Sequence, residues 1–167
     1  MFEVCAGHRG GAMSVDAFGA LIARVTGKIQ GMPVDKTLKD FLDAQFPASG
    51  ADFAAIEAAC KAAVAEGWMC KHEAGGIRYG RVIKPGPATH GFSVDVVEMA
   101  ECKGPHHRHP NGEIDMIMLL DGDAKFDGHP RGWCVYGPDS AHYPTVSGGR
   151  AYVLYLLPEG AIEFTKP

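Results

Sequence analysis

The spacing of hydrophobic residues changes near the middle of the chain. In the first half, apolar residues recur at intervals of three and four, which is the period of an amphipathic helix. Three helices are predicted there: one begins behind a Ser14 cap, one is led by Asp35, and one is preceded by Asp52 and closed by Gly67. None of them carries a cluster of catalytic residue types. We therefore expect this part to serve packing or dimerisation.

From Gly75 onward the pattern becomes that of short strands. Runs rich in β-branched and aromatic residues are separated by Gly, Pro, Asp and Ser, at 77–83, 92–99, 114–120, 133–136, 151–157 and 161–164. This spacing is typical of an all-β sandwich or barrel. Helical patterns do not interleave with the strands, so a parallel βαβ sheet is not expected. The prediction is an α+β chain with a loose tail (1–13), a helical N-terminal region (14–74) and an antiparallel β-barrel domain (75–167).

Composition narrows the functional classes. The chain has 167 residues, of which 46% are hydrophobic and 22% charged, so it can bury a full core. A net charge of −4 argues against nucleic acid as a partner. No apolar run reaches the roughly 20 residues that span a bilayer, so no membrane partner is expected. The five cysteines form no CxxC pair, and no secretory signal is visible, so a cytoplasmic location is expected.

The stretch HHRHPNGEID combines several potential metal ligands. In an extended strand, His107 and His109 project to one side and Arg108 to the other. A short turn then brings Glu113 back toward the same point, and a second turn supplies His142 about one hairpin later. Imidazoles and a carboxylate in this number suit a divalent ion of Fe, Mn, Ni, Co or Zn with open coordination positions. The alternative is that the histidines line an apolar pocket without metal.

These two segments resemble the paired motifs of the cupin superfamily, which are small jelly-roll barrels. HRH is followed after three residues by Glu113, as in the first motif. Eight residues instead of six separate Glu113 from Gly122, whereas Asp115 is correctly spaced from Gly122 but too far from His109. Either carboxylate would fit as the ligand. Glu113 is favoured because of its spacing from the histidines and its longer side chain.

A more specific resemblance covers most of the chain. The segments GRVIKPGPATHGFSVDVVEMAECKGPHHRHPNGEIDMIM and FDGHPRGWCVYGPDSAHYPTV, behind a helical N-terminal part, are similar to the 4-hydroxylaminobenzoate lyase family. The resemblance implies conversion of 4-hydroxylaminobenzoate to 3,4-dihydroxybenzoate with release of ammonia. It also implies a small aromatic acid as substrate.

Such a substrate is a flat anion, so its site needs an apolar slot and a cation. Arg78 and Arg81 are the candidates for binding the carboxylate, because Arg108 should face away from the metal ligands. The slot would be formed by whichever residues face inward among Met116, Met118, Trp133, Tyr136, Tyr152 and Tyr155. A Lewis-acidic metal would act on the hydroxylamine oxygen. Whichever of Glu113 and Asp115 is not a ligand would move protons.

Two other functions are compatible with the same residues. One is a different metal-dependent cupin enzyme, such as an aromatic-ring dioxygenase, which would consume oxygen. The other is a non-catalytic cupin that binds a small aromatic acid without turnover. In each case a homodimer is expected, because the apolar helices can cover a barrel edge.

Overall fold

The computed structural model describes residues 13–166, so all but the last residue of the predicted tail (1–13) lies outside the described residues. Three helices come first: α1 (Val15–Ile29), α2 (Lys36–Gln45) and α3 (Ala51–Ala65). The strands follow, with one short 3-10 helix: β1 (His72–Ala74), β2 (Ile77–Ile83), η1 (Pro87–Thr89), β3 (Phe92–Lys103), β4 (His107–His109), β5 (Glu113–Phe126), β6 (Gly132–Tyr136), β7 (Ser140–His142), β8 (Thr145–Pro158) and β9 (Glu163–Phe164).

Two of the helices, α1 and α2, begin where capping side chains satisfy the first free amides, whereas α3 begins after Gly50 without a side-chain cap. The Ser14 hydroxyl accepts a hydrogen bond from Ala17 N (3.0 Å), and the Asp35 carboxylate accepts one from Leu38 N (3.2 Å). The Ser14 cap was predicted, and Asp35 was predicted to lead the second helix. No helix in the described part of the chain is long and apolar enough to cross a membrane.

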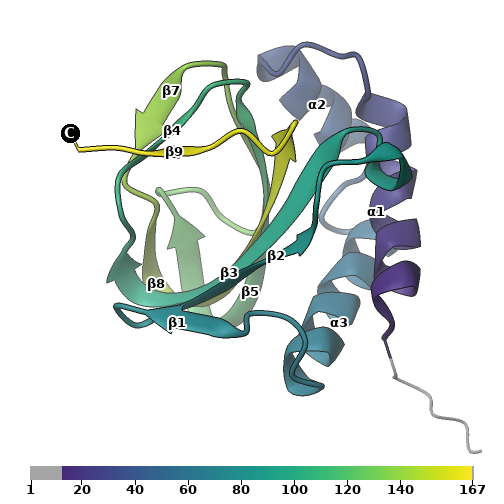
Figure 1. Ribbon diagram of the computed structural model, residues 1–167. Coiled ribbons are helices and arrows are strands. Elements are labelled where there is room, and N and C mark those ends of the chain that lie inside the picture. Colours follow the sequence, from purple (N-terminus) through teal and green to yellow (C-terminus); the bar gives the residue numbers. More distant parts are fainter. Residues whose placement is uncertain (1–12, 167) are drawn as a thin grey trace, which may run out of the picture.

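The strands form two antiparallel sheets that face each other across a barrel (Figure 1). The large sheet has the order β1-β2-β3-β8-β5-β6, and the small sheet has the order β7-β4-β9. Strand β2 matches its predicted range, whereas β5 and β8 are much longer than predicted, at 14 residues each. The predicted α+β architecture, a helical segment followed by an antiparallel cupin-type barrel, is confirmed.

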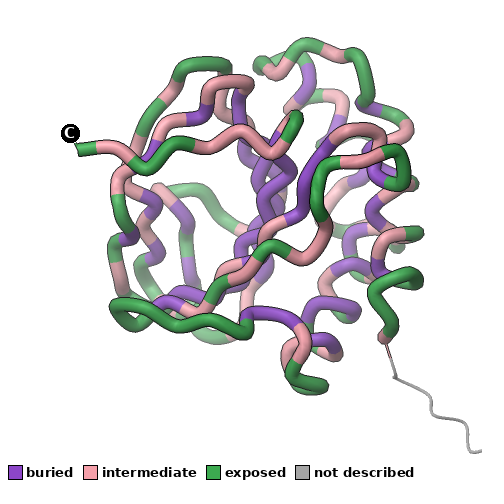
Figure 2. The backbone as a smooth tube through the Cα atoms, in the orientation of Figure 1, coloured by how far each residue is buried: buried purple, intermediate pink, exposed green. Residues whose placement is uncertain are grey.

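The large sheet is buried on both faces along its central strands. Its outer face carries Ile114, Met116 and Trp133, which pack with the three helices in one hydrophobic cluster. Its inner face carries Ile117 and Val153, which belong to the second cluster, inside the barrel. Buried positions therefore run along the strands and along the helix faces that meet them (Figure 2).

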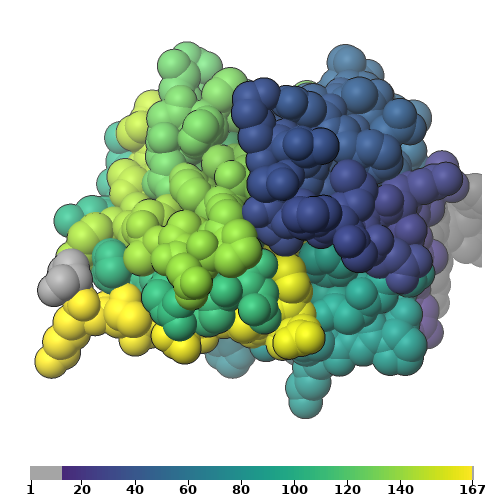
Figure 3. Space-filling view, turned by 90° about the horizontal axis from the view of Figure 1, so that it is seen from above, coloured from purple at the N-terminus to yellow at the C-terminus, as the bar shows by residue number. Residues whose placement is uncertain are grey.

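The helices share a core with the barrel, so they are not a bundle standing apart from it. Trp133 on β6 donates a hydrogen bond from Nε1 to the carbonyl of Phe46 at the end of α2 (2.7 Å). Nearby, Arg131 donates to the Glu57 carboxylate on α3 (2.9 Å). Figure 3 shows the α2 region, in blue, directly against the green β6–β7 part of the barrel. The domain boundary at residue 75 stays a prediction. Strand β1, which ends just before this boundary, already pairs with β2 in the large sheet.

Candidate metal centre

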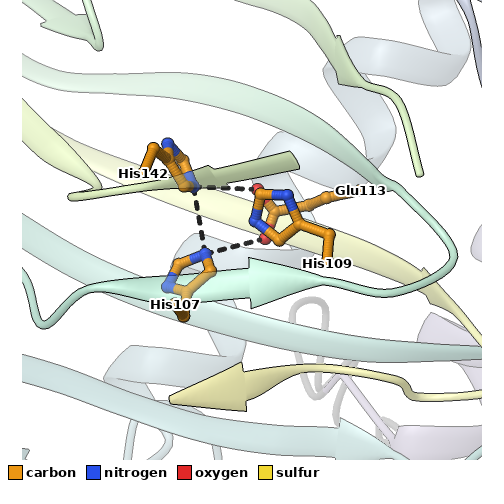
Figure 4. Close-up of side chains that lie close together, drawn as sticks. All are labelled: His107, His109, Glu113 and His142. Carbon is orange, nitrogen blue, oxygen red and sulfur yellow. Dashed lines mark hydrogen bonds and ion pairs between the residues drawn. The ribbon is translucent and has the colours of Figure 1, made fainter. Parts of the chain in front are cut away.

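The four residues predicted as metal ligands meet between the two sheets. His107 and His109 alternate with Arg108 on β4, and both of these histidines are buried while Arg108 is half-buried. His142 on β7 is the register partner of His107. Glu113 begins β5 and reaches the histidines from the large sheet, as Figure 4 shows.

The potential ligand atoms of these four residues are spaced as the ligands of a single metal ion are. Glu113 oxygens are 3.5, 3.2 and 3.5 Å from the Nε2 atoms of His107, His109 and His142. The Nε2 atoms of His107 and His142 are 3.0 Å apart, and all four ligand atoms lie within 4.8 Å of one another. Metal–ligand bonds of about 2.0–2.2 Å place neighbouring ligand atoms about 3.0–3.5 Å apart. The spacing therefore fits one divalent ion.

The turn between His109 and Glu113 depends on Gly112. Its φ is +88°, a conformation that favours glycine, and its amide donates to the carbonyl of His109 (3.2 Å). A Cβ atom at this position would lie 2.6 Å from Val34 Cγ1 and 2.9 Å from the carbonyl oxygen of Tyr136. The chain thus turns back tightly against the loop before α2, and this turn brings Glu113 to the histidines.

Two of the imidazoles are oriented by hydrogen bonds at Nδ1. His142 Nδ1 is 2.5 Å from Asp127 Oδ2, and His109 Nδ1 is 2.9 Å from Ser140 Oγ. The Ser140 hydroxyl donates to the carbonyl of Gly137 (2.6 Å), so toward His109 it acts as the acceptor. Both histidines then carry a proton on Nδ1, which leaves the Nε2 lone pairs for a metal ion.

The electrostatics of the cluster favour a cation at its centre. Burial raises the pKa of Glu113, but the three imidazoles that surround its carboxylate hold this pKa well below its usual range. Burial likewise opposes the charged form of His142, yet Asp127 and Glu113 raise its pKa to about 9. Both Glu113 oxygens and His109 Nε2 are buried without a hydrogen-bond partner among the described residues. A metal ion would satisfy these atoms, so the residues present fit such a group.

Asp115 lies beside this cluster and not in it. It faces the barrel interior from β5, two residues after Glu113, and both of its carboxylate oxygens are buried without a partner among the described residues. Burial, together with the negative charge of Glu113, raises the pKa of Asp115 well above its usual range. The structure therefore brings Glu113, the favoured carboxylate, to the histidines and leaves Asp115 next to them.

An apolar cavity of about 450 Å³ opens beside His107. Its volume falls within the range of small-molecule sites. Ile77, Met99 and Phe164 are among its apolar walls, while Arg81 and Tyr155 bring polar groups to it.

Of the three arginines considered for binding a carboxylate, Arg81 alone is placed beside the cavity. Arg78 is an ion-pair partner of Glu98 (3.1 Å) and does not line the cavity. Arg108 forms ion pairs with Asp139 and with Glu163 (3.1 Å), on the opposite side of β4 from the histidines, as its strand position predicted.

The aromatic and methionine residues on the strands divide between the two faces of the sheet. Tyr136 and Tyr155 are on the interior side, where Tyr155 lies 6.4 Å from the His107 ring between ring centres. The others pack with the helices and do not form a slot: Met116, Met118, Trp133 and Tyr152. The strand period decides this, because residues 114, 116 and 118 share the face opposite Glu113.

Three residues near the site are not among the predicted ones: Asp127, Ser140 and Phe164. Asp127 and Ser140 bond His142 and His109, and Phe164 pairs with His107 across β4 and β9. Ser140 lies two residues before His142, so strand alternation was a usable signal for it. No local pattern marks Asp127 or Phe164, because the histidines that they contact are 15 or more residues away in sequence.

Comparison with known proteins identifies the family. The family model of 4-hydroxylaminobenzoate lyase matches residues 20–164. A protein named 4-hydroxylaminobenzoate lyase from Nocardioides sp. (strain LMS-CY) is 33% identical over 161 residues, covering 90% of this chain and 92% of its own. One of the same name from Pseudomonas putida is 33% identical over 118 residues, covering 60% and 67%.

Among solved structures, an RmlC-like cupin protein from Ralstonia eutropha is 13% identical, with a TM-score of 0.38, over 51% of this chain and 58% of its own. The family match rests on the family model and on the Nocardioides relative, each of which spans most of the chain. The chain therefore belongs to the 4-hydroxylaminobenzoate lyase family.

Proposed function

We propose that this protein converts 4-hydroxylaminobenzoate to 3,4-dihydroxybenzoate and ammonia, with one water consumed, at a divalent metal site formed by His107, His109, Glu113 and His142. The observation that carries the proposal is the convergence of these four side chains beside an apolar cavity that both His107 and Arg81 line. Membership of the family supports the substrate.

The cavity suits a flat aromatic acid. Arg81, Asp95, Tyr155 and Asp115 are successive register partners across β2, β3, β8 and β5, so they form one row on the inner face of the sheet. Two strand spacings, about 10 Å, separate the strands of Arg81 and Tyr155. This is comparable to the length of a para-substituted benzoate. The proposed pose has the carboxylate at Arg81, the ring beside Tyr155, and the hydroxylamine toward His107.

The reaction needs charge stabilisation at oxygen and proton transfer. A divalent ion held by the cluster supplies a Lewis acid for the developing charge. Arg81 binds and orients the carboxylate through its guanidinium group. Asp115 is the proposed proton-transfer residue, because it lies next to Glu113 and has no hydrogen-bond partner of its own within the described residues. The apolar walls exclude bulk water from the ring.

The test combines metal analysis with a product assay. Purified protein is expected to contain stoichiometric divalent metal and to form 3,4-dihydroxybenzoate and ammonia in equal amounts, with or without oxygen. The His107→Ala/His109→Ala variant should lose both metal and turnover. His129→Ala is the matched control, since His129 is exposed in the turn after β5.

Three outcomes would contradict the proposal. Bound metal without turnover of 4-hydroxylaminobenzoate would reject the substrate. Turnover that requires oxygen would instead indicate a dioxygenase. Full activity in the double-histidine variant would show that the cluster is not the reacting site.

A further inference from the structure

Asp127 is attached at its backbone to the beginning of β8. It lies just after β5 with a φ of +49°, and its amide donates to the carbonyl of Thr145 (2.8 Å). One carboxylate oxygen, Oδ1, accepts a hydrogen bond from Thr145 N (2.9 Å). These two bonds to the backbone of Thr145 fix the position of the Asp127 carboxylate independently of any other side chain.

The other carboxylate oxygen joins two residues from strands of different sheets. Asp127 Oδ2 is 2.5 Å from the hydroxyl of Tyr136 on β6 and 2.5 Å from Nδ1 of His142 on β7. The side chain of Asp127 is only 16% exposed, so water competes little for these bonds. The Asp127 carboxylate thus connects Tyr136 on β6, His142 on β7 and Thr145 on β8.

The hydrogen bonds of Asp127 influence the orientation of two of the three histidines. His142 is oriented directly by its bond to Asp127. His109 is reached through Tyr136, whose ring centre is 5.6 Å from that of His109 and 4.5 Å from that of His142. His107, by contrast, has no hydrogen-bond partner at Nδ1 among residues 13–166 and lines the cavity.

We infer that Asp127 is a positioning residue for the metal centre. It holds the His142 imidazole and the Tyr136 ring, which packs against both His142 and His109, so that the Nε2 atoms of the two histidines face the ion. A carboxylate bonded to a ligand imidazole also makes that imidazole a better donor to the metal. The inference rests on the proposed metal site, but it does not depend on the substrate.

Asp127→Asn is the variant that tests this. Asn has nearly the same shape and, like Asp, tolerates a positive φ, so the turn is retained. The variant removes the charge and replaces one acceptor oxygen with an amide that cannot accept. Asp123→Asn is the matched control, because Asp123 is an exposed carboxylate near the end of β5, four residues before Asp127.

The measurement is the affinity of the metal-free protein for Co²⁺, followed by visible absorption, and for Zn²⁺, followed by competition, in the absence of substrate. We expect Asp127→Asn to bind about 10–100-fold more weakly and to shift the Co²⁺ bands. Asp123→Asn should match the wild type. Urea unfolding of the metal-free variants separates this effect from a loss of stability, which by itself leaves the spectrum of the bound ion unchanged.

Wild-type affinity and spectrum in Asp127→Asn would overturn the positioning role while leaving the proposed metal site in place. Failure of the wild-type protein to bind either ion would overturn the inference together with that site. Metal binding with no turnover of 4-hydroxylaminobenzoate would reject the proposed reaction alone, because neither readout uses the substrate.

Discussion

Arg81 and Asp95 form a two-pronged ion pair on the inner face of the large sheet, with Nε–Oδ1 and Nη2–Oδ2 distances of 2.8 and 3.1 Å. Nη2 also donates to the carbonyl of Gly160 (3.2 Å), while Nη1 has no partner within the described residues. Both side chains line the cavity. Asp95 therefore fixes the plane of the guanidinium group and leaves one nitrogen available for a ligand.

Replacing Arg81 with Gln should weaken substrate binding. Loss of a charged hydrogen bond costs about 1.5–3 kcal/mol, so the KM should rise about 10–100-fold while kcat changes little. Arg78→Gln is the control, since Arg78 is also an ion-paired arginine on β2 but does not line the cavity. The KM of each variant is measured by steady-state kinetics. Equal KM values in the two variants would reject Arg81 as the carboxylate-binding residue.

Phe164 should contribute to binding of the aromatic ring. It is 69% exposed, it lines the cavity, and its ring centre is 6.0 Å from that of His107. Aromatic contacts contribute about 0.5–1.5 kcal/mol, so Phe164→Ala should raise the KM about two- to tenfold. Phe164→Tyr should retain most of the affinity. Val15→Ala, an exposed apolar residue on α1, should have no effect on KM, and the idea fails if Phe164→Ala behaves the same way.

Metal binding should stabilise the fold. An ion that binds only the folded state at 100 times its Kd adds about 2.7 kcal/mol to the free energy of unfolding. For a domain of this size, that corresponds to a rise in Tm of about 5–10 °C. Thermal unfolding followed by circular dichroism, with and without Zn²⁺ or Mn²⁺, measures the shift. The His142→Ala variant should show little of it; a shift as large as that of the wild type would place the ion elsewhere.

Alanine substitutions at Gly112 and Gly128 distinguish two ways in which an added side chain lowers stability: an unfavourable φ and a steric clash. Both have a positive φ, +88° and +82°, but only Gly112 would clash, with Val34 and the Tyr136 carbonyl. Gly128→Ala should lose about 1–2 kcal/mol from the φ alone. Gly112→Ala should lose more and should also weaken metal binding, since it displaces the turn before Glu113. Urea unfolding gives both values, and equal losses would show that the contact with Val34 relaxes freely.

The sequence alone predicts the elements of this fold well, because each follows from a local period. The helix that begins after Ser14 and the strand at 77–83 are where the pattern of apolar residues places them. The lengths of β5 and β8 were underestimated, since the second half of β5 (LDGDAKF) and the beginning of β8 (TVSGGR) are rich in polar residues and glycine. The pairing of β5 with β8 also contains register shifts in this part. Pairing with a neighbouring strand keeps these segments extended, and local propensity does not report such pairing.

The metal cluster was predictable for a related reason. His107, His109 and Glu113 lie within seven residues, so strand alternation and one turn suffice to bring them together. His142 was found by the position of a second turn. The choice of Glu113 over Asp115 was favoured by spacing, and the structure places Glu113 among the histidines.

What only the tertiary structure decided depends on contacts between distant strands. The sequence determined that the chain has helices, a barrel and a group of histidines just before a strand, since each of these features depends on residues that are close together in sequence. It did not determine that Arg81, and not Arg78, borders the cavity, or that Asp127 orients His142. Each of these facts depends on which face of a strand meets which neighbour, and packing across the whole barrel sets that register.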